Sequence, residues 1–410
     1  MNSFQPSLLA IPGPSVMPER VLRAMHRASP NIYEGELHEI TDSLVPDLKT
    51  VAQTRHNVAM YICNGHGTWE AALANTINPG DTVLVLETGR FGKGWGELAR
   101  TMGIETQSID FGDANDVDIN QLEAVLRADS QGKIKAVLSV QTDTSTSVKS
   151  DIPSMRKALD AAGHDALLMV DCIACLGCDE FLMDAWGVDV MVAASQKGLM
   201  TPPGMGFVWF NEKAHTVRSS VSPSLYWDWS RRIDPEVYYQ YFAGTAPTHH
   251  IYGLREALNM LVHEEGLEAA WARHARIANA IWAAVDAWGP DTVSHNVEDR
   301  AKRSTAVSAL KTAPDLATKM RDWCEREAGL VLGIGLGFDD FDSRFRIGHM
   351  GHQHHPMTLG VLGTIDCAFK ALGAPHGAGA VEAASAVLAA GGSGTPDNIT
   401  LGESAKTECC

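Results

Sequence analysis

The feature that most constrains this chain is a repeated alternation of short apolar runs and helix-like segments between residues 55 and 210. The apolar runs are rich in Val, Ile, Leu and Ala, and each ends in a glycine-rich or polar segment. Such runs predict buried strands, and strands that alternate with helices predict a doubly wound, mainly parallel α/β sheet. The predicted strands are residues 58–63, 81–86, 134–140, 166–170 and 188–194.

Polar residues follow two of these strands at their carboxyl ends, where open α/β sheets bind their ligands. Asp171 ends one strand, and Ser195-Gln196-Lys197 follows another, just before the turn Thr201-Pro202-Pro203-Gly204. An aspartate and a lysine at strand ends suit pyridoxal phosphate (PLP). This cofactor needs an acidic partner for its pyridine nitrogen and a lysine amine that binds its aldehyde. The alternative is that Asp171 caps a turn and Lys197 is a surface lysine.

A glycine-flanked turn, Asn64-Gly65-His66-Gly67-Thr68, joins the strand over residues 58–63 to a helix predicted from Trp69. Backbone N–H groups and the positive end of a helix dipole make such a turn a binding site for phosphate. The turn lacks the lysine of a P-loop and the third glycine of the dinucleotide-binding motif. A purely structural turn is the alternative, and His66 either lies near a cofactor or simply packs.

Three further residues lie where a ligand at this sheet edge would meet them. Phe91 follows the strand over residues 81–86, and a flat ring could stack on it, or it packs a loop. Thr144 belongs to a hydroxyl-rich segment that binds a ligand or makes a turn. The proline-rich residues 8–14 predict an extended arm in which Gly13 lets the backbone approach a ligand. The joint occurrence of these residues argues for a binding site.

Length and charge narrow the class of protein. A chain of 410 residues is long for one core, so two domains are predicted. The net charge of −17, without a basic patch, argues against nucleic acid as a partner. No apolar run reaches the roughly 18 residues that a membrane helix needs, and the N-terminus lacks the pattern of a signal peptide. We therefore expect a cytoplasmic protein that binds neither nucleic acid nor a membrane.

Cysteine and histidine clusters could in principle hold a metal. Cys172, Cys175 and Cys178 have the C-x2-C-x2-C spacing of an iron–sulfur ligand run, but no fourth cysteine follows in ligand spacing. Their neighbours are small or apolar, so a structural role is predicted. The irregular spacing of four histidines favours a polar loop over a metal site, and no metal is expected. These histidines are His349, His352, His354 and His355.

Six separated motifs give the chain a resemblance to the class V aminotransferases, from about residue 8 to about residue 390. The branch that it resembles contains the alanine–, serine– and aspartate–glyoxylate aminotransferases and the pyridoxamine–pyruvate aminotransferases. The motifs are Pro12-Gly13-Pro14, Asn64-Gly65-His66-Gly67-Thr68-Trp69-Glu70, Asp171, Ser195-Gln196-Lys197, Pro202-Pro203-Gly204 and Arg346-Ile347-Gly348-His349-Met350-Gly351.

The resemblance implies the PLP-dependent transferase fold of type I, with a large, mainly parallel domain and a smaller C-terminal α/β domain. The expected limits are an N-terminal arm over residues 1–20, a large domain over 21–255 and a small domain over 256–390. Residues 391–410, which contain Cys409-Cys410, are expected to form a flexible tail. The resemblance also implies a homodimer, with a tetramer as the alternative, whose sites lie at the subunit interface.

The resemblance assigns roles to single residues. Lys197 would carry the cofactor and move the substrate proton, and Asp171 would hold the pyridine nitrogen. Thr245 matches a position that reaches the phosphate of the neighbouring subunit. Phe242 replaces a tyrosine common in the family, and whether Tyr241 takes its place stays open. The other implied cofactor contacts are Gly65, His66, Gly67, Phe91, Thr144 and Gln196, and the implied substrate contacts are Gly13, Tyr33 and Arg346, the last holding a carboxylate.

The implied activity moves an amino group from a small amino acid (alanine, serine or aspartate) to a small 2-oxo acid such as glyoxylate or pyruvate. Residues 88–95 and Tyr33 resemble pyridoxamine–pyruvate aminotransferase more closely, so that activity, or another amine–pyruvate transfer, is the alternative. The acidic residue which that enzyme has near the position of His66 is absent here. A lyase or desulfurase would need a mobile cysteine in the loop before Arg346, where the sequence has none.

Overall fold

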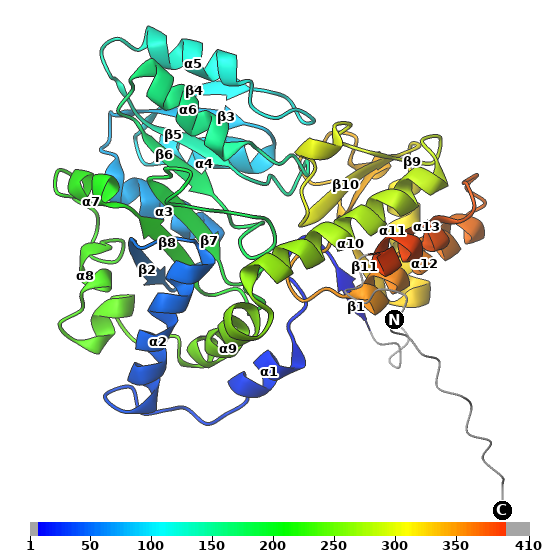
Figure 1. The fold of residues 1–410 in the computed structure, drawn as a ribbon, viewed down its shortest axis with the longest axis horizontal. Coiled ribbons are helices and arrows are strands. Elements are labelled where there is room, and N and C mark those ends of the chain that lie inside the picture. The colour runs from blue at the N-terminus through cyan, green and yellow to red at the C-terminus, as the bar shows by residue number, and fades with distance from the viewer. Residues whose placement is uncertain (1–6, 391–410) are drawn as a thin grey trace, which may run out of the picture.

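The computed structural model describes residues 7–390, and within them the strands form two sheets (Figure 1). The larger sheet has seven strands in the order β2-β8-β7-β6-β5-β3-β4. All of them run parallel except β8, which is antiparallel to both its neighbours. The predicted α/β class is thereby confirmed. The strands are β2 (Asn57–Tyr61), β3 (Thr82–Glu87), β4 (Glu105–Asp110), β5 (Ile134–Val140), β6 (Leu167–Asp171), β7 (Val190–Ala194) and β8 (Gly206–Phe210).

Side chains alternate between the two faces of this sheet along each strand. Because both faces carry apolar side chains, helices cover both of them. On β6, Leu168 and Val170 face a core built with α2, α5, α6 and α9, whereas Leu167 and Met169 face one built with α3 and α4. Both faces are therefore buried, and the central strands are mostly apolar. The helices of this half are α1 (Glu19–Met25), α2 (Glu36–Val51), α3 (Gly65–Thr76), α4 (Arg90–Thr101), α5 (Ile119–Ala128), α6 (Ile152–Ala162), α7 (Glu212–Arg218), α8 (Ser230–Ile233), η1 (Tyr238–Phe242) and α9 (Thr248–Leu258).

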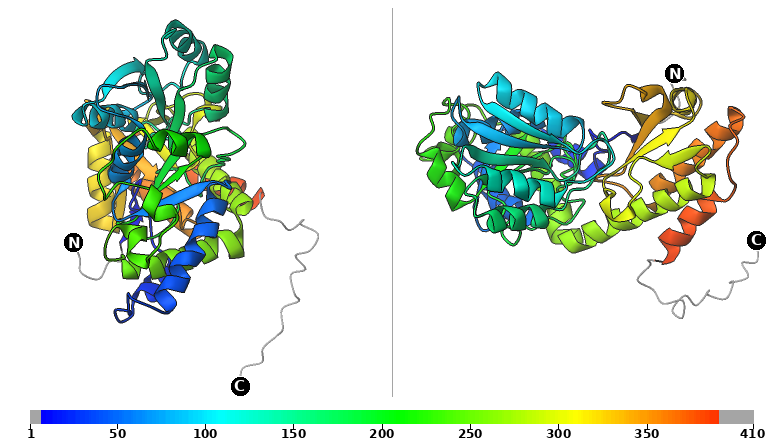
Figure 2. Two further views of the ribbon diagram at one scale, coloured as in Figure 1. Left: turned by 90° about the vertical axis from the view of Figure 1, so that its left-hand side faces the viewer. Right: turned by 90° about the horizontal axis from the view of Figure 1, so that it is seen from above.

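The smaller sheet has five strands in the order β1-β11-β12-β10-β9. It is antiparallel except for β1, which pairs parallel with β11 and so joins the start of the chain to the C-terminal half. Four helices cover one face and share a second core with it (Figure 2). The elements are β1 (Leu8–Ala10), η2 (Asn259–Glu265), α10 (Leu267–Trp288), β9 (Val293–His295), η3 (Arg300–Lys302), β10 (Val307–Thr312), α11 (Leu316–Ala328), β11 (Leu330–Ile334), η4 (Phe341–Ser343), β12 (Arg344–Gly348), α12 (His355–Ala371) and α13 (Ala380–Ala390).

Helix α10 bridges the two halves of the molecule (Figure 1). Its first residues, Leu267 and Ala270, belong to the core beneath the larger sheet, and its residues from Ile277 onward belong to the core of the smaller one. The predicted domain limits stay predictions, and the one at residue 255 falls inside α9. The flexible tail predicted for residues 391–410 lies outside the described residues.

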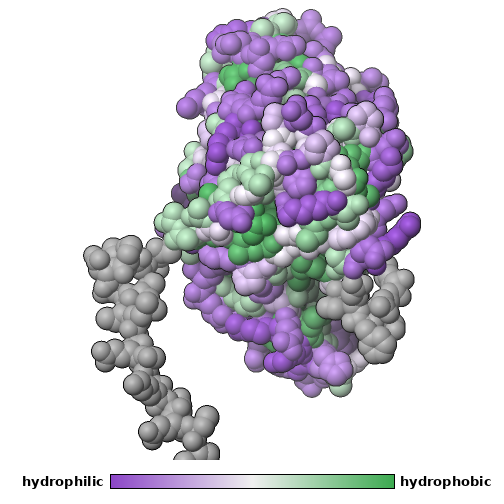
Figure 3. Space-filling model, turned by 90° about the vertical axis from the view of Figure 1, so that its right-hand side faces the viewer, coloured by the Kyte–Doolittle hydropathy of each residue, from purple (hydrophilic) through white to green (hydrophobic). Residues whose placement is uncertain are grey.

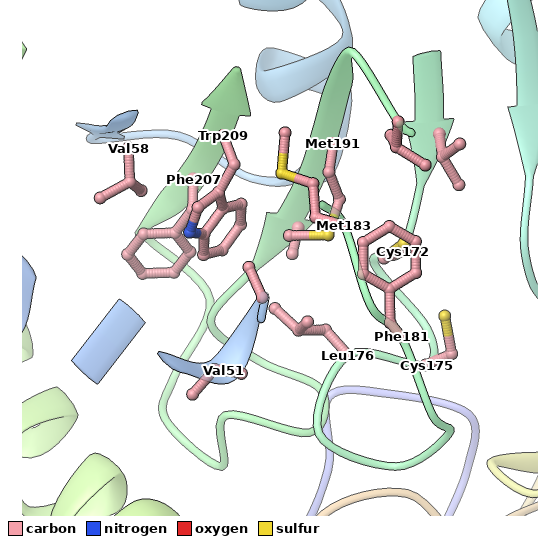
Figure 4. Close-up of a cluster of buried hydrophobic side chains, with 14 of the residues drawn as sticks. Val51, Val58, Cys172, Cys175, Leu176, Phe181, Met183, Met191, Phe207 and Trp209 are labelled. Carbon is pink, nitrogen blue, oxygen red and sulfur yellow. The ribbon is translucent and has the colours of Figure 1, made fainter. Parts of the chain in front are cut away.

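The cysteines of the C-x2-C-x2-C run are buried. Cys172 and Cys175 lie in the core with Phe181 and Met183 (Figure 4), and their Sγ atoms contact Gln141 Oε1 at 3.4 and 3.1 Å. His349 is also buried, with its Nε2 3.0 Å from Ser308 Oγ. Within residues 7–390, no three or more potential ligands gather as they would around a metal ion.

Polar side chains predominate on the face that carries the smaller sheet, with apolar side chains in smaller groups between them (Figure 3). In the described part of the chain, no helix combines the length and apolarity that crossing a membrane would require.

Candidate active site

The glycine-flanked turn forms the start of α3, as a phosphate site would require. The helix begins at Gly65, four residues before the predicted start, because Asn64 caps it: Asn64 Oδ1 accepts a hydrogen bond from the Gly67 N–H at 3.3 Å. The first backbone N–H groups of a helix have no partner within it, so those of Gly65 and His66 are donors for an anion.

Lys197 lies just past β7, and its surroundings hold it from several sides. Its Nζ donates a hydrogen bond to the carbonyl of Pro12, and its own carbonyl accepts one from Ser15 Oγ at 2.7 Å. Gly13 has φ +93°, a conformation that favours glycine, and a Cβ there would meet the end of the Lys197 side chain, so the arm passes close to the lysine. Burial lowers the pKa of Lys197 to about 8, which favours the neutral amine that a nucleophile or base requires.

Asp171, at the end of β6, is buried and held by two donors. Its Oδ2 accepts a hydrogen bond from Trp69 Nε1 at 2.8 Å, and its Oδ1 accepts one from the Ile173 N–H at 2.6 Å. Burial nevertheless raises the pKa of Asp171 to about 7. A cationic group beside this carboxylate would lower that pKa again. Trp69 is not among the residues predicted for the site, although a buried indole N–H needs an acceptor and would have suggested it.

Asp171 and Lys197 line one cavity of about 180 Å³, together with most of the residues predicted to bind the cofactor. Two side-chain atoms of this lining, Thr142 Oγ1 and Gln196 Oε1, are buried without a hydrogen-bond partner in the described chain. A polar ligand would satisfy them. The lining residues are Asn64, Gly65, His66, Trp69, Phe91, Thr142, Thr144, Asp171, Ile173, Ala174, Gln196 and Lys197.

Arg346 comes from β12 of the smaller sheet and reaches across to the larger one. It is buried, its Nε donates to the Ile334 carbonyl at 2.7 Å, and its Nη1 donates to the Thr144 carbonyl at 2.9 Å. Arg346 does not line the Lys197 cavity itself, but Thr144 does. Among the described residues Nη2 makes no hydrogen bond, which leaves a cationic donor beside the cavity.

Asp143 is a second residue that the motifs do not identify. It is fully buried after β5, and its Oδ2 accepts hydrogen bonds from the Phe91 and Gly92 N–H groups at 2.8 and 3.2 Å. The carboxylate thereby caps α4 and fixes the backbone that carries Phe91. Only the tertiary structure brings these residues together, because they are 52 positions apart in the chain.

Tyr33 and Thr245 do not line the Lys197 cavity. Tyr33 is 85% exposed and Thr245 is exposed, so their predicted contacts stay predictions. Phe242 is buried in the core, and the neighbouring Tyr241 hydroxyl donates to Asp42 Oδ1 at 2.8 Å. Neither residue lines the Lys197 cavity.

A family model described as aminotransferase class V matches residues 8–320. The chain is 36% identical to the serine–glyoxylate aminotransferase of Methylorubrum extorquens, over 86% of this chain and 89% of that protein. It is 35% identical to the L-aspartate–glyoxylate aminotransferase of Paracoccus denitrificans, over 94% of this chain and 96% of that protein. These matches confirm the resemblance carried by the motifs.

Solved structures give the same result. The pyridoxamine–pyruvate aminotransferase from Mesorhizobium loti superposes with a TM-score of 0.85 at 25% identity, covering 95% of this chain and 99% of that chain. The ureidoglycine–glyoxylate aminotransferase from Bacillus subtilis superposes with a TM-score of 0.83 at 25% identity, covering 95% of this chain and 100% of that chain. The predicted fold is therefore shared by proteins whose names describe amino-group transfer.

Proposed function

The chain belongs to the class V aminotransferase family, and we propose that it transfers an amino group from a small amino acid to a small 2-oxo acid, with PLP as cofactor. Alanine, serine and aspartate are the proposed donors, and glyoxylate and pyruvate the proposed acceptors. The observation that carries the proposal is the shared cavity of Lys197 and Asp171, a nucleophilic amine and a buried carboxylate at adjacent strand ends.

The residues of this cavity fit PLP. Asp171 is a buried carboxylate with a raised pKa. A cationic neighbour would stabilise its ionised form, and a protonated pyridine nitrogen is such a neighbour. The first turn of α3 offers N–H donors for a phosphate, and Thr142 Oγ1 and Gln196 Oε1 lack partners. Phe91 offers an aromatic face. When bound, PLP supplies an aldehyde that captures amines and a ring that accepts electrons from the substrate Cα.

Side chains of this chain would position the substrate and move the proton of the reaction. The neutral amine of Lys197 acts as the base that takes the proton from the substrate Cα and would then deliver it to the carbon that had been the PLP aldehyde. Arg346 holds the substrate carboxylate through the free edge of its guanidinium, which orients the Cα–H bond toward Lys197. Asp171, held by Trp69, would be ionised beside the protonated pyridine nitrogen of PLP and would place a fixed negative charge in the cavity.

A homodimer is part of this proposal. Thr245 is exposed on its own chain, which agrees with a role in binding the phosphate of a neighbouring subunit's cofactor. The homodimer and the cytoplasmic location both stay predictions from the sequence.

A panel of amino donors and oxo-acid acceptors tests the proposed function. Purified protein loaded with PLP is incubated with alanine, serine, aspartate or pyridoxamine, each with glyoxylate or pyruvate, and the keto and amino products are measured. We expect turnover with at least one amino acid. Turnover with pyridoxamine alone would establish the second candidate, which the structural similarity to the Mesorhizobium loti enzyme supports. No turnover with any pair would overturn both.

Replacing Arg346 by lysine should impair both half-reactions. Lysine keeps the charge but cannot pair with a carboxylate in the planar, two-pronged manner of arginine. Because donor and acceptor would use the same carboxylate site, we expect kcat/KM to fall by about 10-fold or more in each half, on the scale of one hydrogen bond to a charged group. Single-turnover absorbance of each half-reaction measures this. Damage confined to the oxo-acid half would instead indicate a donor without a carboxylate.

A further inference from the structure

A second cavity, of about 340 Å³, adjoins the Lys197 cavity and shares three lining residues with it: His66, Trp69 and Phe91. The rest of its lining comes mainly from α4 and includes Gly337, in the loop between β11 and β12. This loop leads to Arg346. The second cavity therefore lies beside the reacting centre, between the two halves of the molecule, where the side chain of a bound substrate could extend.

Arg90 lines this second cavity from the first position of α4, directly before Phe91. Its backbone N–H donates to Ser145 Oγ at 3.0 Å. Its aliphatic stem packs against Gly337, whose Cβ position would lie 3.1 Å from Arg90 Cβ and 3.4 Å from Arg90 Cδ. Gly337 has φ +88°, a conformation that favours glycine, so the loop leaves room for this arginine. The stem of Arg90 thus lies between both halves of the molecule.

Arg90 is itself exposed, and no acidic side chain of the described chain forms an ion pair with it. Its neighbour Lys93, by contrast, forms an ion pair with Asp110 at 3.3 Å. Burial, and after it the charge of Arg90, lower the pKa of His66, so this charge acts on a residue common to both cavities.

Two carboxylates, Glu97 and Asp113, also line the second cavity, and both are exposed. The sum of charges around the cavity therefore does not identify a ligand. The position of Arg90 is more informative. Arg90 is next to Phe91 in the chain, and its charge helps to lower the pKa of His66; both of these residues also line the Lys197 cavity.

We propose that Arg90 binds the side-chain carboxylate of the amino donor, which makes an amino dicarboxylic acid such as aspartate the preferred donor class. The proposal rests on the proposed function and assigns the two carboxylates of the donor to two arginines. Arg346, beside Thr144, takes the α-carboxylate, and Arg90, beside Phe91, takes the second one. A planar guanidinium without an acidic partner suits this task because it can bind a carboxylate by two parallel hydrogen bonds.

The test compares Arg90→Gln with Arg100→Gln in the PLP-loaded enzyme. Arg100 is an exposed arginine of the same helix that bonds to Thr106 and does not line the cavity, so its variant controls for the loss of one positive charge. In single-turnover donor half-reactions, we expect Arg90→Gln to lower kcat/KM for aspartate by about 10- to 100-fold, on the scale of a lost hydrogen bond to a charged group. The value for alanine should stay within about 2-fold, as for an ordinary surface substitution.

Binding of unreactive acids gives a readout independent of turnover. Calorimetric titration should show that the wild-type enzyme binds succinate more tightly than propionate, and that Arg90→Gln, but not Arg100→Gln, removes this difference. Equal losses for aspartate and alanine, no loss for either, or a wild-type enzyme that rejects aspartate would each overturn the role of Arg90. If alanine or serine still reacts in those cases, the proposed function stands. An enzyme that accepts no amino acid contradicts the proposed function itself.

Discussion

Replacing Lys197 by alanine should abolish amino-group transfer, the largest effect expected of any single change in this chain. The residue would supply both the amine that binds the cofactor and the base that moves the substrate proton, and no other lysine lines its cavity. A loss of about 10⁴-fold or more in kcat is expected, the scale seen when the central group of a catalytic unit is removed. The fold should persist, because the side chain makes one hydrogen bond, to the Pro12 carbonyl.

The measurement is single-turnover product formation, accompanied by borohydride reduction and peptide mapping of the wild-type protein loaded with PLP. The variant should still bind PLP without a covalent bond, which keeps loss of cofactor distinct from loss of the base. A matched control is Lys149→Ala, because Lys149 is also partly buried but pairs with Asp179 at 2.9 Å away from the cavity. Labelling of a lysine other than Lys197 would refute the central assignment.

Asp171→Asn should leave the fold intact and lower the rate by about 10²-fold or more. Asparagine has nearly the same shape and can still accept a hydrogen bond from Trp69 Nε1, but it lacks the charge that a protonated pyridine nitrogen needs. Steady-state kcat with the best donor of the panel measures the effect. Turnover close to that of the wild type would mean that Asp171 does not hold the cofactor.

The same substitution should change how stability depends on pH in the chain without cofactor. Burial raises the pKa of Asp171 to about 7, whereas an unfolded aspartate has a pKa of about 3.9. Between these values the folded chain holds a proton that the unfolded chain has lost, so the contribution of Asp171 to the free energy of unfolding falls as pH rises from about 4 to about 7. Thermal melting across this window should show the fall in the wild type and a smaller one in Asp171→Asn.

The sequence alone determined the class of fold and the reacting pair. Apolar runs of strand length that end in Asp171 and before Lys197 are local patterns, and they predict buried strands whose ends share one sheet edge. The turn around Gly65 and Gly67 is local as well, because strand, glycine turn and helix follow one another in the chain. Family resemblance added roles to these positions, and the comparisons confirmed the family.

Only the tertiary structure decided what surrounds the reacting pair. Trp69 reaches Asp171 over 102 positions, Asp143 holds the backbone of Phe91 over 52, and Arg346 reaches Thr144 over 202. No local pattern specifies such contacts, because they depend on which helix covers which sheet face and on how the two sheets are placed. The same holds for Arg90. It packs against Gly337 and lines the second cavity only because the two halves of the molecule meet there. Sequence periodicity fixes which face of an element is buried, whereas packing across distant elements determines the charges and hydrogen bonds that a substrate would meet.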